Sequence, residues 1–498
     1  MSVFERNIIR NKILKRTGVV DIGSNTIRLV VFEGPSRSPR YFYNEKVNCG
    51  LGMGLIQSGK LNDKGQKKAY KTIQRFNSIL KSMDVFKTYF IATSAVRNAK
   101  NGNQFINRIE KNIRIKIKVI TGIEEGILAA SGVLMGWPKA SGLVCDIGGS
   151  SLELVYLKSG KIITSQSFEL GPLALQYHQN EDKFKQRYIN QELSKINKRF
   201  PKNINSLFLV GGCWRAIAKI HMNLTYYPLK VLQGYKTCVD DFDKTLKTIF
   251  NRKISYLLKK TSSSEERVKL LPDACKVLIS IYDRFNPEQL FFSGYGIREG
   301  IFFSQFSEDI RKLDPLIQAC LYLENNRSRF PGFGKLLFEW LLPIFPELDK
   351  NQKKLYLAAC YLHDTIWQAH PDYRSEVCFE TVTGANLGGI DHSGRIFLAI
   401  SLMSRYKKTD LNEINEKYLT LLNITKIKEA IILGACMRLG AMLSVNIKEN
   451  LIKTKIYIQE NTIYLKMMEK DNLFGDAVEK RLNHLSTLMN LKSKIFLE

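Results

Sequence analysis

GVVDIGSNTIRLVVFEG, at residues 18–34, and LVCDIGGSSLELVYLKSG, at residues 143–160, follow one pattern. Each is an apolar run, an Asp-Ile-Gly tripeptide, a few small polar residues and a second apolar run. The pattern predicts a buried strand, a tight turn and a returning strand. Because it occurs twice, with its aspartates at Asp21 and Asp146, it predicts two related lobes.

The small polar residues of the two turns point to phosphate binding. Glycine lets a backbone approach a ligand closely, and Ser, Asn and Thr add hydrogen-bond donors. Rows of backbone N–H groups suit phosphate oxygens. We therefore expect the turns to face each other and to hold one phosphorylated substrate. The expected phosphate-binding positions are Ser24, Asn25 and Thr26 in the first turn, and Gly148, Gly149, Ser150 and Ser151 in the second.

Length and composition predict a globular protein of two to four domains, because 498 residues exceed one ordinary core. Nine cysteines without C-x-x-C spacing favour a reducing cytoplasm. No apolar run reaches membrane-spanning length. The first 16 residues carry five basic side chains and no apolar region, so we expect a basic leader and not a secretory signal.

The net charge of +28 (75 basic minus 47 acidic residues) suits a polyanionic partner. A Lys-rich solvated surface explains the charge equally well. No helix-turn-helix, RNP or zinc-finger signature occurs, so no nucleic-acid partner is expected.

Strand and helix patterns alternate up to about residue 305, and helical periods dominate after it. Before that point we predict helices at residues 63–82 and 124–134 and a strand at 115–120. After it we predict helices at 336–342, 353–363, 394–406 and 427–443 and a hairpin at 455–467. The predicted fold class is α/β followed by an all-α domain. The predicted domains are residues 1–135, 136–308 and 309–498.

Seven motifs, in order, resemble the exopolyphosphatase / guanosine pentaphosphate phosphohydrolase family. They are DIGSNTIRLVV from Asp21, ATSAVRNA from Ala92, TGIEEG from Thr121, DIGGSSLELV from Asp146, FELGPL from Phe168, VGGCWRAIAK from Val210 and SGYGIREG from Ser293. CYLHDTIWQAHPDYR and GIDHSGR resemble the C-terminal extension of the long-form members. The resemblance implies two actin-like (ribonuclease H-like) lobes, as in actin, the heat-shock chaperones and sugar kinases, followed by a helical HD-like domain.

The resemblance also implies Mg²⁺-dependent hydrolysis of a phosphoanhydride by water. Asp146 matches the family's metal-associated aspartate, Glu153 closes the same motif, and Asp21 is the equivalent acid of the first turn. Glu125 matches the base that activates water. Its neighbour Glu124 has the alternative role of complementing a helix dipole.

Three arginines, and four residues that depart from the family pattern, bear on how the substrate is bound. Arg97 is expected to contact phosphate through its guanidinium; the alternative is a surface arginine at a helix start, where its charge would be unfavourable with the helix dipole. Arg28 can point either way along its strand, and Arg298 is expected to pair structurally with Glu299. Four residues depart from the pattern and concern the phosphate contacts and chain-length preference: Ser150, which restricts a position that would need positive φ, Leu152, Gly50 and Trp214.

His363 and Asp364 raise a second metal hypothesis in the helical domain, with His370, Asp391 and His392 as further ligands. No histidine lies between His221 and His363, so an upstream ligand is missing. We therefore favour a degenerate relic that forms a channel wall or dimer surface. Arg405, Lys407 and Lys408 are the expected lining residues of a basic groove.

The leading hypothesis is a cytoplasmic, homodimeric exopolyphosphatase that releases orthophosphate from polyphosphate with Mg²⁺. The alternative within the family is removal of the 5′-terminal phosphate of guanosine pentaphosphate. Two hypotheses from other classes are a sugar or acid kinase, which needs an adenosine site, and an inactive binding module. The joint presence of the four acids argues against the inactive module.

Overall fold

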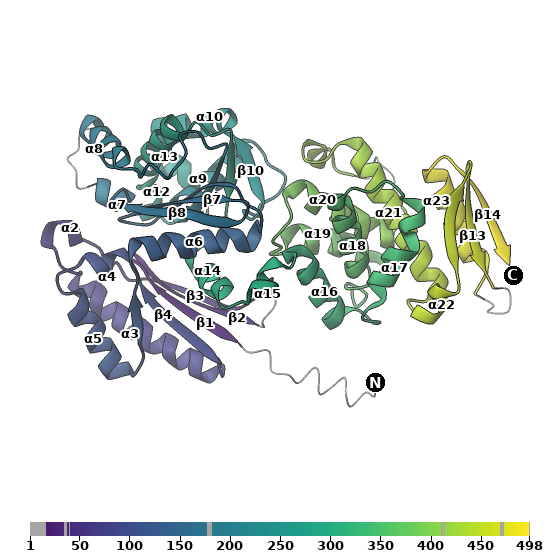
Figure 1. Cartoon of the computed structure of the whole chain (residues 1–498), viewed down its shortest axis with the longest axis horizontal. Helices are drawn as coiled ribbons and strands as arrows, with labels where there is room; N and C mark the ends of the chain where they lie inside the picture. The colour runs from purple at the N-terminus through teal and green to yellow at the C-terminus, as the bar shows by residue number, and fades with distance from the viewer. Residues whose placement is uncertain are drawn as a thin grey trace. The chain divides into compact units, whose positions relative to one another are not determined.

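The computed structural model describes residues 16–33, 37–38, 40–176, 182–409, 412, 414–468 and 473–497. Nearly all of the predicted basic leader therefore lies outside the described residues. The described chain forms two compact units (Figure 1). The first comprises the described residues up to Tyr227 together with Leu232–Leu313; the second comprises Pro228–Val231 and those from Asp314 onward. The borders predicted at residues 135 and 308 stay a prediction.

The first sheet of the first unit has the strand order β3-β2-β1-β4-β5. Its strands are β1 (Thr17–Ile22), β2 (Thr26–Glu33), β3 (Arg40–Asn48), β4 (Lys87–Ala92) and β5 (Ile117–Val119), and its helices are α2 (Leu55–Ser58), α3 (Asp63–Ser82), α4 (Ser94–Asn98) and α5 (Gly102–Ile113). β1 runs antiparallel to β2 and parallel to β4. Ile73, Phe76 and Ile109 are fully buried and join the core beneath this sheet.

The second sheet has the order β10-β11-β9-β6-β7-β8. Its strands are β6 (Gly142–Ile147), β7 (Leu152–Lys158), β8 (Lys161–Phe168), β9 (Ser206–Gly211), β10 (Tyr235–Cys238) and β11 (Gln289–Phe292). Its helices are α7 (Pro172–Leu175), α8 (Asp182–Ser194), α9 (Gly212–Leu224), α10 (Val239–Asn251), α11 (Ile254–Leu258), α12 (Glu265–Val268) and α13 (Leu271–Phe285). Apart from β10, this sheet repeats the first: β6 pairs antiparallel with β7 and parallel with β9. The duplicated sequence pattern therefore corresponds to a duplicated topology.

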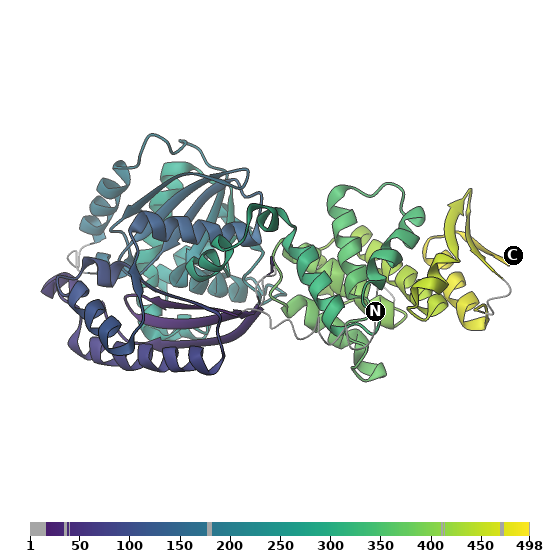
Figure 2. The same ribbon diagram turned by 60° about the horizontal axis from the view of Figure 1, so that its bottom comes forward.

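Two helices lie between the sheets, α6 (Gly122–Gly136) and α14 (Ile297–Ser304), and α15 (Glu308–Lys312) follows (Figures 1 and 2). One apolar cluster joins Val19 and Phe32 of the first sheet, Val144 and Val155 of the second, and the two helices. Glycine permits this close packing, because a Cβ built on Gly300 would lie 1.8 Å from the carbonyl oxygen of Leu128. The pair thereby fixes the start of α6 and the start of α14 near both sheets.

The second unit is mainly helical and ends in a three-stranded sheet. Its elements are α16 (Pro315–Arg327), α17 (Phe333–Leu341), η1 (Leu342–Ile344), α18 (Lys350–Leu362), η2 (Pro371–Tyr373), α19 (Arg374–Gly384), α20 (His392–Tyr406), η4 (Glu416–Thr420), α21 (Ile424–Ser444), α22 (Lys448–Ile452), β12 (Lys455–Gln459), β13 (Thr462–Met467), α23 (Asp476–Leu488) and β14 (Lys492–Leu497). The hairpin prediction matches β12 and β13, but the prediction lacked β14, which pairs parallel with β13. None of the described helices is long and apolar enough to cross a membrane.

Candidate active site

The two Asp-Ile-Gly turns meet. Asp21 and Asp146 occupy equivalent positions, each one residue before the end of the first strand of its hairpin. A Cβ built on Gly149 of the second turn would lie 3.3 Å from the Cβ of Ser24 in the first. The two turns therefore approach each other closely at Gly149, where an added Cβ would be tightly packed. The expectation that the turns face each other is therefore correct.

The same backbone hydrogen bond closes each turn. Gly23 N donates to Thr26 O at 3.0 Å, and Gly148 N donates to Ser151 O at 2.9 Å. Ser150 is not among the residues with positive φ, so the restriction expected there does not arise. Gly171 of the FELGPL motif backs the second turn, since a Cβ there would lie 2.4 Å from Gly149 O.

Glu124 and Glu125 lie in the first turn of α6 and have different roles. Glu124 forms a capping box with Thr121: its N–H donates to Thr121 Oγ1 at 3.2 Å, and its Oε2 accepts from Thr121 N at 2.9 Å. Its Oε1 also pairs with Lys118 Nζ at 2.6 Å. Glu125 is 4% exposed and pairs through Oε2 with Arg97 Nη1 at 3.1 Å. Glu124 thus stabilises the helix end, whereas Glu125 faces the interior.

Arg97 lies in the last turn of the short helix α4 and is not a surface arginine at a helix start. Its Nη1 donates to Ile120 O at 2.6 Å as well as to Glu125. The guanidinium therefore orients the carboxylate of Glu125. Contact between Arg97 and phosphate stays a prediction.

Four buried or half-buried carboxyl groups share one electrostatic environment. Burial raises the pKa of Glu125 to about 7; Arg97 opposes the rise, and Asp146 and Asp21 add to it. Burial raises the pKa of Asp146 to about 6, opposed by Arg215 and Arg298 and reinforced by Asp21. Burial, with Glu125 and Asp146, raises the pKa of Glu153 well above its usual range.

Asp21 joins the same group from the first turn. Burial raises the pKa of Asp21, while Arg298 and Arg28 oppose the rise. Since the four acids alter one another's pKa, the fold gathers Asp21, Glu125, Asp146 and Glu153 at one place. Groups whose pKa values are shifted by burial and by like charge are characteristic of functional sites.

The chemistry of the carboxylates fits a divalent cation. Glu153 is fully buried; its Oε1 accepts from Ser167 Oγ at 2.9 Å, and its Oε2 is buried without a hydrogen-bond partner among the described residues. Mg²⁺ prefers carboxylate oxygen and keeps waters and substrate phosphates as further ligands. Within the described ranges, no three His, Cys, Asp or Glu side chains already form a complete ligand set. Such an ion would therefore rely on one or two carboxylates.

Sequence reasoning missed three arginines at this site. Arg28 lies opposite Asp21 in the first hairpin. Arg215, in α9, donates from Nε to Ser293 O at 2.9 Å. Arg298 is 9% exposed, and its Nε has no hydrogen-bond partner within the described part of the chain. Arg28 could have been found from the sequence, because the register of the predicted hairpin places it directly opposite Asp21. No local signal marks Arg215 or Arg298, because tertiary packing places them.

The expected pairing of Arg298 with Glu299 is not what the structure has. Glu299 instead accepts from Gly296 N at 2.7 Å and from Tyr41 Oη at 3.1 Å. Burial and the positive charges of Arg267, Arg28 and Arg298 lower the pKa of Lys46. Several cations therefore gather beside the carboxylates, as an anionic substrate requires.

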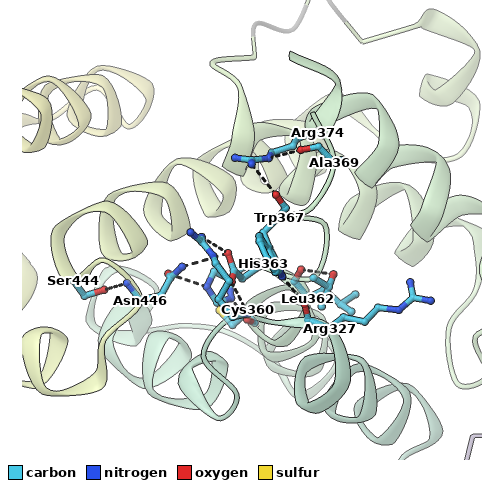
Figure 3. Close-up of polar contacts among 12 residues, drawn as sticks. Arg327, Cys360, Leu362, His363, Trp367, Ala369, Arg374, Ser444 and Asn446 are labelled. Carbon is cyan, nitrogen blue, oxygen red and sulfur yellow. Dashed lines mark hydrogen bonds and ion pairs between the residues drawn. The ribbon is translucent and has the colours of Figure 1, made fainter. Parts of the chain in front are cut away.

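His363 of the second unit is enclosed by protein hydrogen bonds (Figure 3), and Asp364 also has protein partners. His363 Nδ1 lies 2.7 Å from Cys360 O, and Nε2 lies 3.2 Å from Asn446 Oδ1. Burial lowers the pKa of His363 to about 4, so the ring is neutral at pH 7. Asp364 accepts from Arg329 Nη2 at 2.6 Å and Nε at 3.1 Å, and from Asn446 Nδ2 at 3.3 Å.

The other expected metal ligands of this unit have separate positions. Asp391 caps α20 by accepting from Gly394 N at 2.9 Å. His370 caps η2 and lies 3.7 Å from Asp372. His392 is buried at the start of α20. The hydrogen bonds of His363 and Asp364 favour the interpretation of a relic, and the HD-like description stays a prediction.

Comparison with known proteins agrees with the motifs. A model described as the Ppx/GppA phosphatase family matches residues 30–308, and one described as exopolyphosphatase, C-terminal matches residues 316–496. Exopolyphosphatase 1 of Mycobacterium tuberculosis is 33% identical over 142 residues, covering 28% of this chain and 41% of that protein. The matched segment thus spans less than half of this curated relative.

A second relative matches over more of the chain. The guanosine-5′-triphosphate,3′-diphosphate pyrophosphatase of Aeromonas salmonicida is 22% identical over 369 residues, covering 69% of this chain and 71% of that protein. Among solved structures, an exopolyphosphatase from Cytophaga hutchinsonii has a TM-score of 0.53 at 24% identity, covering 58% of this chain and 97% of that one. A Ppx/GppA enzyme of Aquifex aeolicus has a TM-score of 0.51 at 23% identity, covering 59% of this chain and 100% of that one. These likenesses establish the fold of the first unit, and with the family match over residues 30–308 they show that the chain belongs to the Ppx/GppA phosphatase family.

Proposed function

We propose that the chain is an exopolyphosphatase that hydrolyses the terminal phosphoanhydride of inorganic polyphosphate. The observation that carries the proposal is the gathering of four carboxyl groups with Arg28, Arg97, Arg215 and Arg298 where two phosphate-type turns meet. Acids can hold water or a cation, and arginines neutralise phosphate oxygens.

In the proposed mechanism, the N–H groups and hydroxyls of the two turns hold the terminal phosphoryl group. Glu125, oriented by Arg97, accepts a proton from a water molecule as that water attacks phosphorus. The new P–O bond forms as the bridging P–O bond breaks, so the products are orthophosphate and a polyphosphate one unit shorter. A base whose pKa lies near 7 suits this proton transfer.

Asp146 and Glu153, with Asp21 beside them, are the proposed holders of Mg²⁺. When bound, the ion supplies positive charge that polarises water and shields phosphate oxygens. The buried Glu153 Oε2, which has no partner in the described ranges, supports this assignment. We further propose a cytoplasmic location and a homodimer, both by family resemblance.

The second unit has a cluster of cations that suits phosphate groups. Arg405, Arg438 and Arg481 lie on α20, α21 and α23, and each has a buried guanidinium nitrogen without a partner among the described residues. Burial and the charges of Arg481 and Arg405 lower the pKa of Arg438 to about 10. Three neighbouring arginines suit an anion. This supports the proposed basic groove, of which Lys407 and Lys408 are exposed members.

Removal of the 5′-terminal phosphate from guanosine pentaphosphate is the second candidate. The similarity to the guanosine-5′-triphosphate,3′-diphosphate pyrophosphatase of Aeromonas salmonicida favours this reaction, because the match covers 71% of that protein. Both reactions use the same turns and the same base.

The test is phosphate release from long-chain polyphosphate and from guanosine pentaphosphate, measured side by side with Mg²⁺. We expect turnover of polyphosphate and its loss in Asp146→Asn. Turnover of the nucleotide alone would establish the second candidate. A requirement for ADP or an acceptor sugar would indicate a kinase, and activity retained in Asp146→Asn would contradict the proposed site.

A further inference from the structure

The sheet that ends the second unit has two chemically different faces. Strand register pairs Ile456 with Leu465 and Leu465 with Ile495 on one face. Ile456, Ile463, Leu465 and Met467 on this face are at most 2% exposed, and helices α17 and α23 contact the strands. Figure 1 shows α23 beside this sheet. One face is therefore the core face of the sheet.

Alternation places nine other side chains on the opposite face. They form three rows across the strands: Lys455, Lys466 and Phe496; Tyr457, Tyr464 and Lys494; and Gln459, Thr462 and Lys492. We call these nine residues the aromatic–lysine face. All nine are exposed or half-buried, and none is acidic.

The three rings of this face form one stack that crosses all three strands. The rings of Tyr457 and Tyr464 have centroids 5.3 Å apart and planes 18° apart, and those of Tyr464 and Phe496 are 5.7 Å and 19° apart. Lys494 Nζ lies 4.9 Å from the centre of the Phe496 ring. Cationic and aromatic groups are thus interleaved on one surface.

Lysines from all three strands share this face. Lys455 and Lys466 are directly opposite each other on neighbouring antiparallel strands, and Lys492 and Lys494 lie on the third strand. Their positive charges suit an anionic ligand. The rings call for a ligand that is also planar and aromatic.

We propose that the aromatic–lysine face binds single-stranded nucleic acid. Bases stack on the outer rings of the aromatic stack, and the lysines pair with the phosphates that join them. Stacking on side chains of an open sheet and backbone neutralisation by lysine are the two components of such binding. The residues come from three strands between positions 455 and 496 and leave no contiguous motif, which is why no nucleic-acid partner was expected from the sequence.

The rings distinguish this ligand from other polyanions. Polyphosphate has no bases, and the bases of a duplex are stacked and paired already. Both should therefore bind through the lysines alone and should be insensitive to removal of the rings. The proposal involves none of the residues assigned to phosphoanhydride hydrolysis, so either can fail without the other.

The experiment uses fluorescence anisotropy of the full chain with a labelled 12-nucleotide RNA, the same sequence as DNA, and its duplex, at two salt concentrations. The variant Tyr457→Leu/Tyr464→Leu/Phe496→Leu removes the rings and keeps apolar side chains. The matched control Tyr226→Leu/Tyr373→Leu/Phe330→Leu removes two tyrosines and a phenylalanine that are 89%, 65% and 43% exposed elsewhere. Single-stranded binding should weaken at least tenfold in the first variant, stay within twofold in the control, and fall with salt.

Several results would overturn the proposal. They are the absence of single-strand binding by the wild type, equal weakening in both triple variants, and binding that the rings do not affect, which would indicate lysine electrostatics alone. A shift from dimer to monomer in the ring variant, without any loss of RNA binding, would assign the face to a second copy of the chain. If circular dichroism shows that the triple variant is unfolded, the single variant Phe496→Leu on the edge strand β14 replaces it. Its affinity for the single strand should fall at least threefold.

Discussion

Glu124 and Glu125 are adjacent in sequence, but their side chains have opposite surroundings. The side chain of Glu124 is 39% exposed and completes a capping box, whereas that of Glu125 is 6% exposed and pairs with Arg97. We expect Glu125→Gln to lower kcat by about 10²–10⁴-fold, since a general base contributes that much. We expect Glu124→Gln to keep kcat within twofold and to lower stability by no more than about 0.5 kcal/mol, because glutamine also completes a capping box and the lost pair with Lys118 is exposed.

The measurement is phosphate release under saturating substrate, with thermal unfolding of each variant alongside. Glu124→Gln serves as the matched control because it makes the same chemical change one residue away. Equal kcat losses in the two variants, or a Glu125→Gln enzyme of normal rate, would remove Glu125 from the role of base.

The raised pKa of Asp146 predicts a dependence of stability on pH. Its pKa rises from 3.8 to about 6 on folding, so between these values the folded state binds more protons than the unfolded state. Stability contributed by this group is therefore greatest below pH 4 and declines as pH rises toward 6. Without divalent cations, Asp146→Asn should stabilise the protein at pH 8 by on the order of 3 kcal/mol.

This effect should fall well below about 1 kcal/mol near pH 4, where Asp146 is protonated in the folded state and only about half ionised in the unfolded state. Chemical unfolding at pH 4, 6 and 8 in the presence of EDTA measures it, with Asp283→Asn on the exposed side of α13 as the control. Excess Mg²⁺ should reduce the difference at pH 8. If Asp146→Asn is less stable than the wild type at every pH, the prediction is wrong. The favourable contacts of the Asp146 carboxylate in the folded protein would then exceed the free-energy cost of burying it.

The helix pair α6 and α14 depends on glycine at the crossing. A Cβ on Gly300 would lie 1.8 Å from Leu128 O, and a Cβ on Gly132 would lie 2.4 Å from Gly296 O. Because both contacts are with backbone, relief requires the helices to separate. We expect Gly300→Ala to lower the free energy of unfolding by about 3 kcal/mol and to reduce activity, since α6 carries Glu125 and α14 carries Arg298.

Denaturant unfolding tests this, with Gly384→Ala as the control. Gly384 ends helix α19, and a Cβ there would have no neighbour within 4 Å. That substitution should change stability by no more than about 0.5 kcal/mol. Equal stability of the two variants would show that α6 and α14 separate without cost.

The elements that sequence predicted well are those fixed by local pattern. Helix α3 begins at Asp63 and ends at Ser82 as predicted, because its apolar period and its Asn62 cap are local. The two hairpins follow from their alternation and turn residues. β14 was missed because its pattern is mixed: only half-buried Ser493 and Ile495 alternate with exposed lysines. It joins its sheet by pairing with β13 across α23.

The site shows the same division between local and tertiary information. Asp21, Glu125, Asp146 and Glu153 were found because they stand in motifs. The arginines at positions 215 and 298 were not assigned there, since only packing of α9 and α14 brings their charges to the acids. The family resemblance, and not the local pattern, distinguished Glu125 from Glu124, because the physical difference lies in which side chain turns toward Arg97.

The buried carboxylates of the two units differ in how fully their oxygens are hydrogen-bonded. In the first, Glu153 keeps a buried oxygen with no partner within the described residues, so a cation can still be accommodated. In the second, Asp364 is satisfied by Arg329 and Asn446, and the two ring nitrogens of His363 have protein partners. Metal dependence should therefore belong to the first unit alone.

Removal of metal by EDTA should accordingly separate the units. We expect phosphate release to stop, and hydrogen exchange to rise in peptides that cover β6 and β7 around Asp146 and Glu153. Exchange in peptides that cover α18 and α20 of the second unit should not change, because protein hydrogen bonds hold His363 and Asp364. Mass spectrometry of the full chain with and without EDTA measures both regions in one experiment.

Arg329→Leu provides the positive control for that measurement. It removes two guanidinium hydrogen bonds from Asp364, which is 1% exposed, and a buried carboxylate without its partner destabilises its surroundings. Exchange near residue 364 should then rise equally with and without EDTA. If EDTA instead raises exchange near residue 364 in the wild type, and Zn²⁺ or Mn²⁺ reverses it, the His-Asp pair binds metal and the interpretation of a relic is wrong.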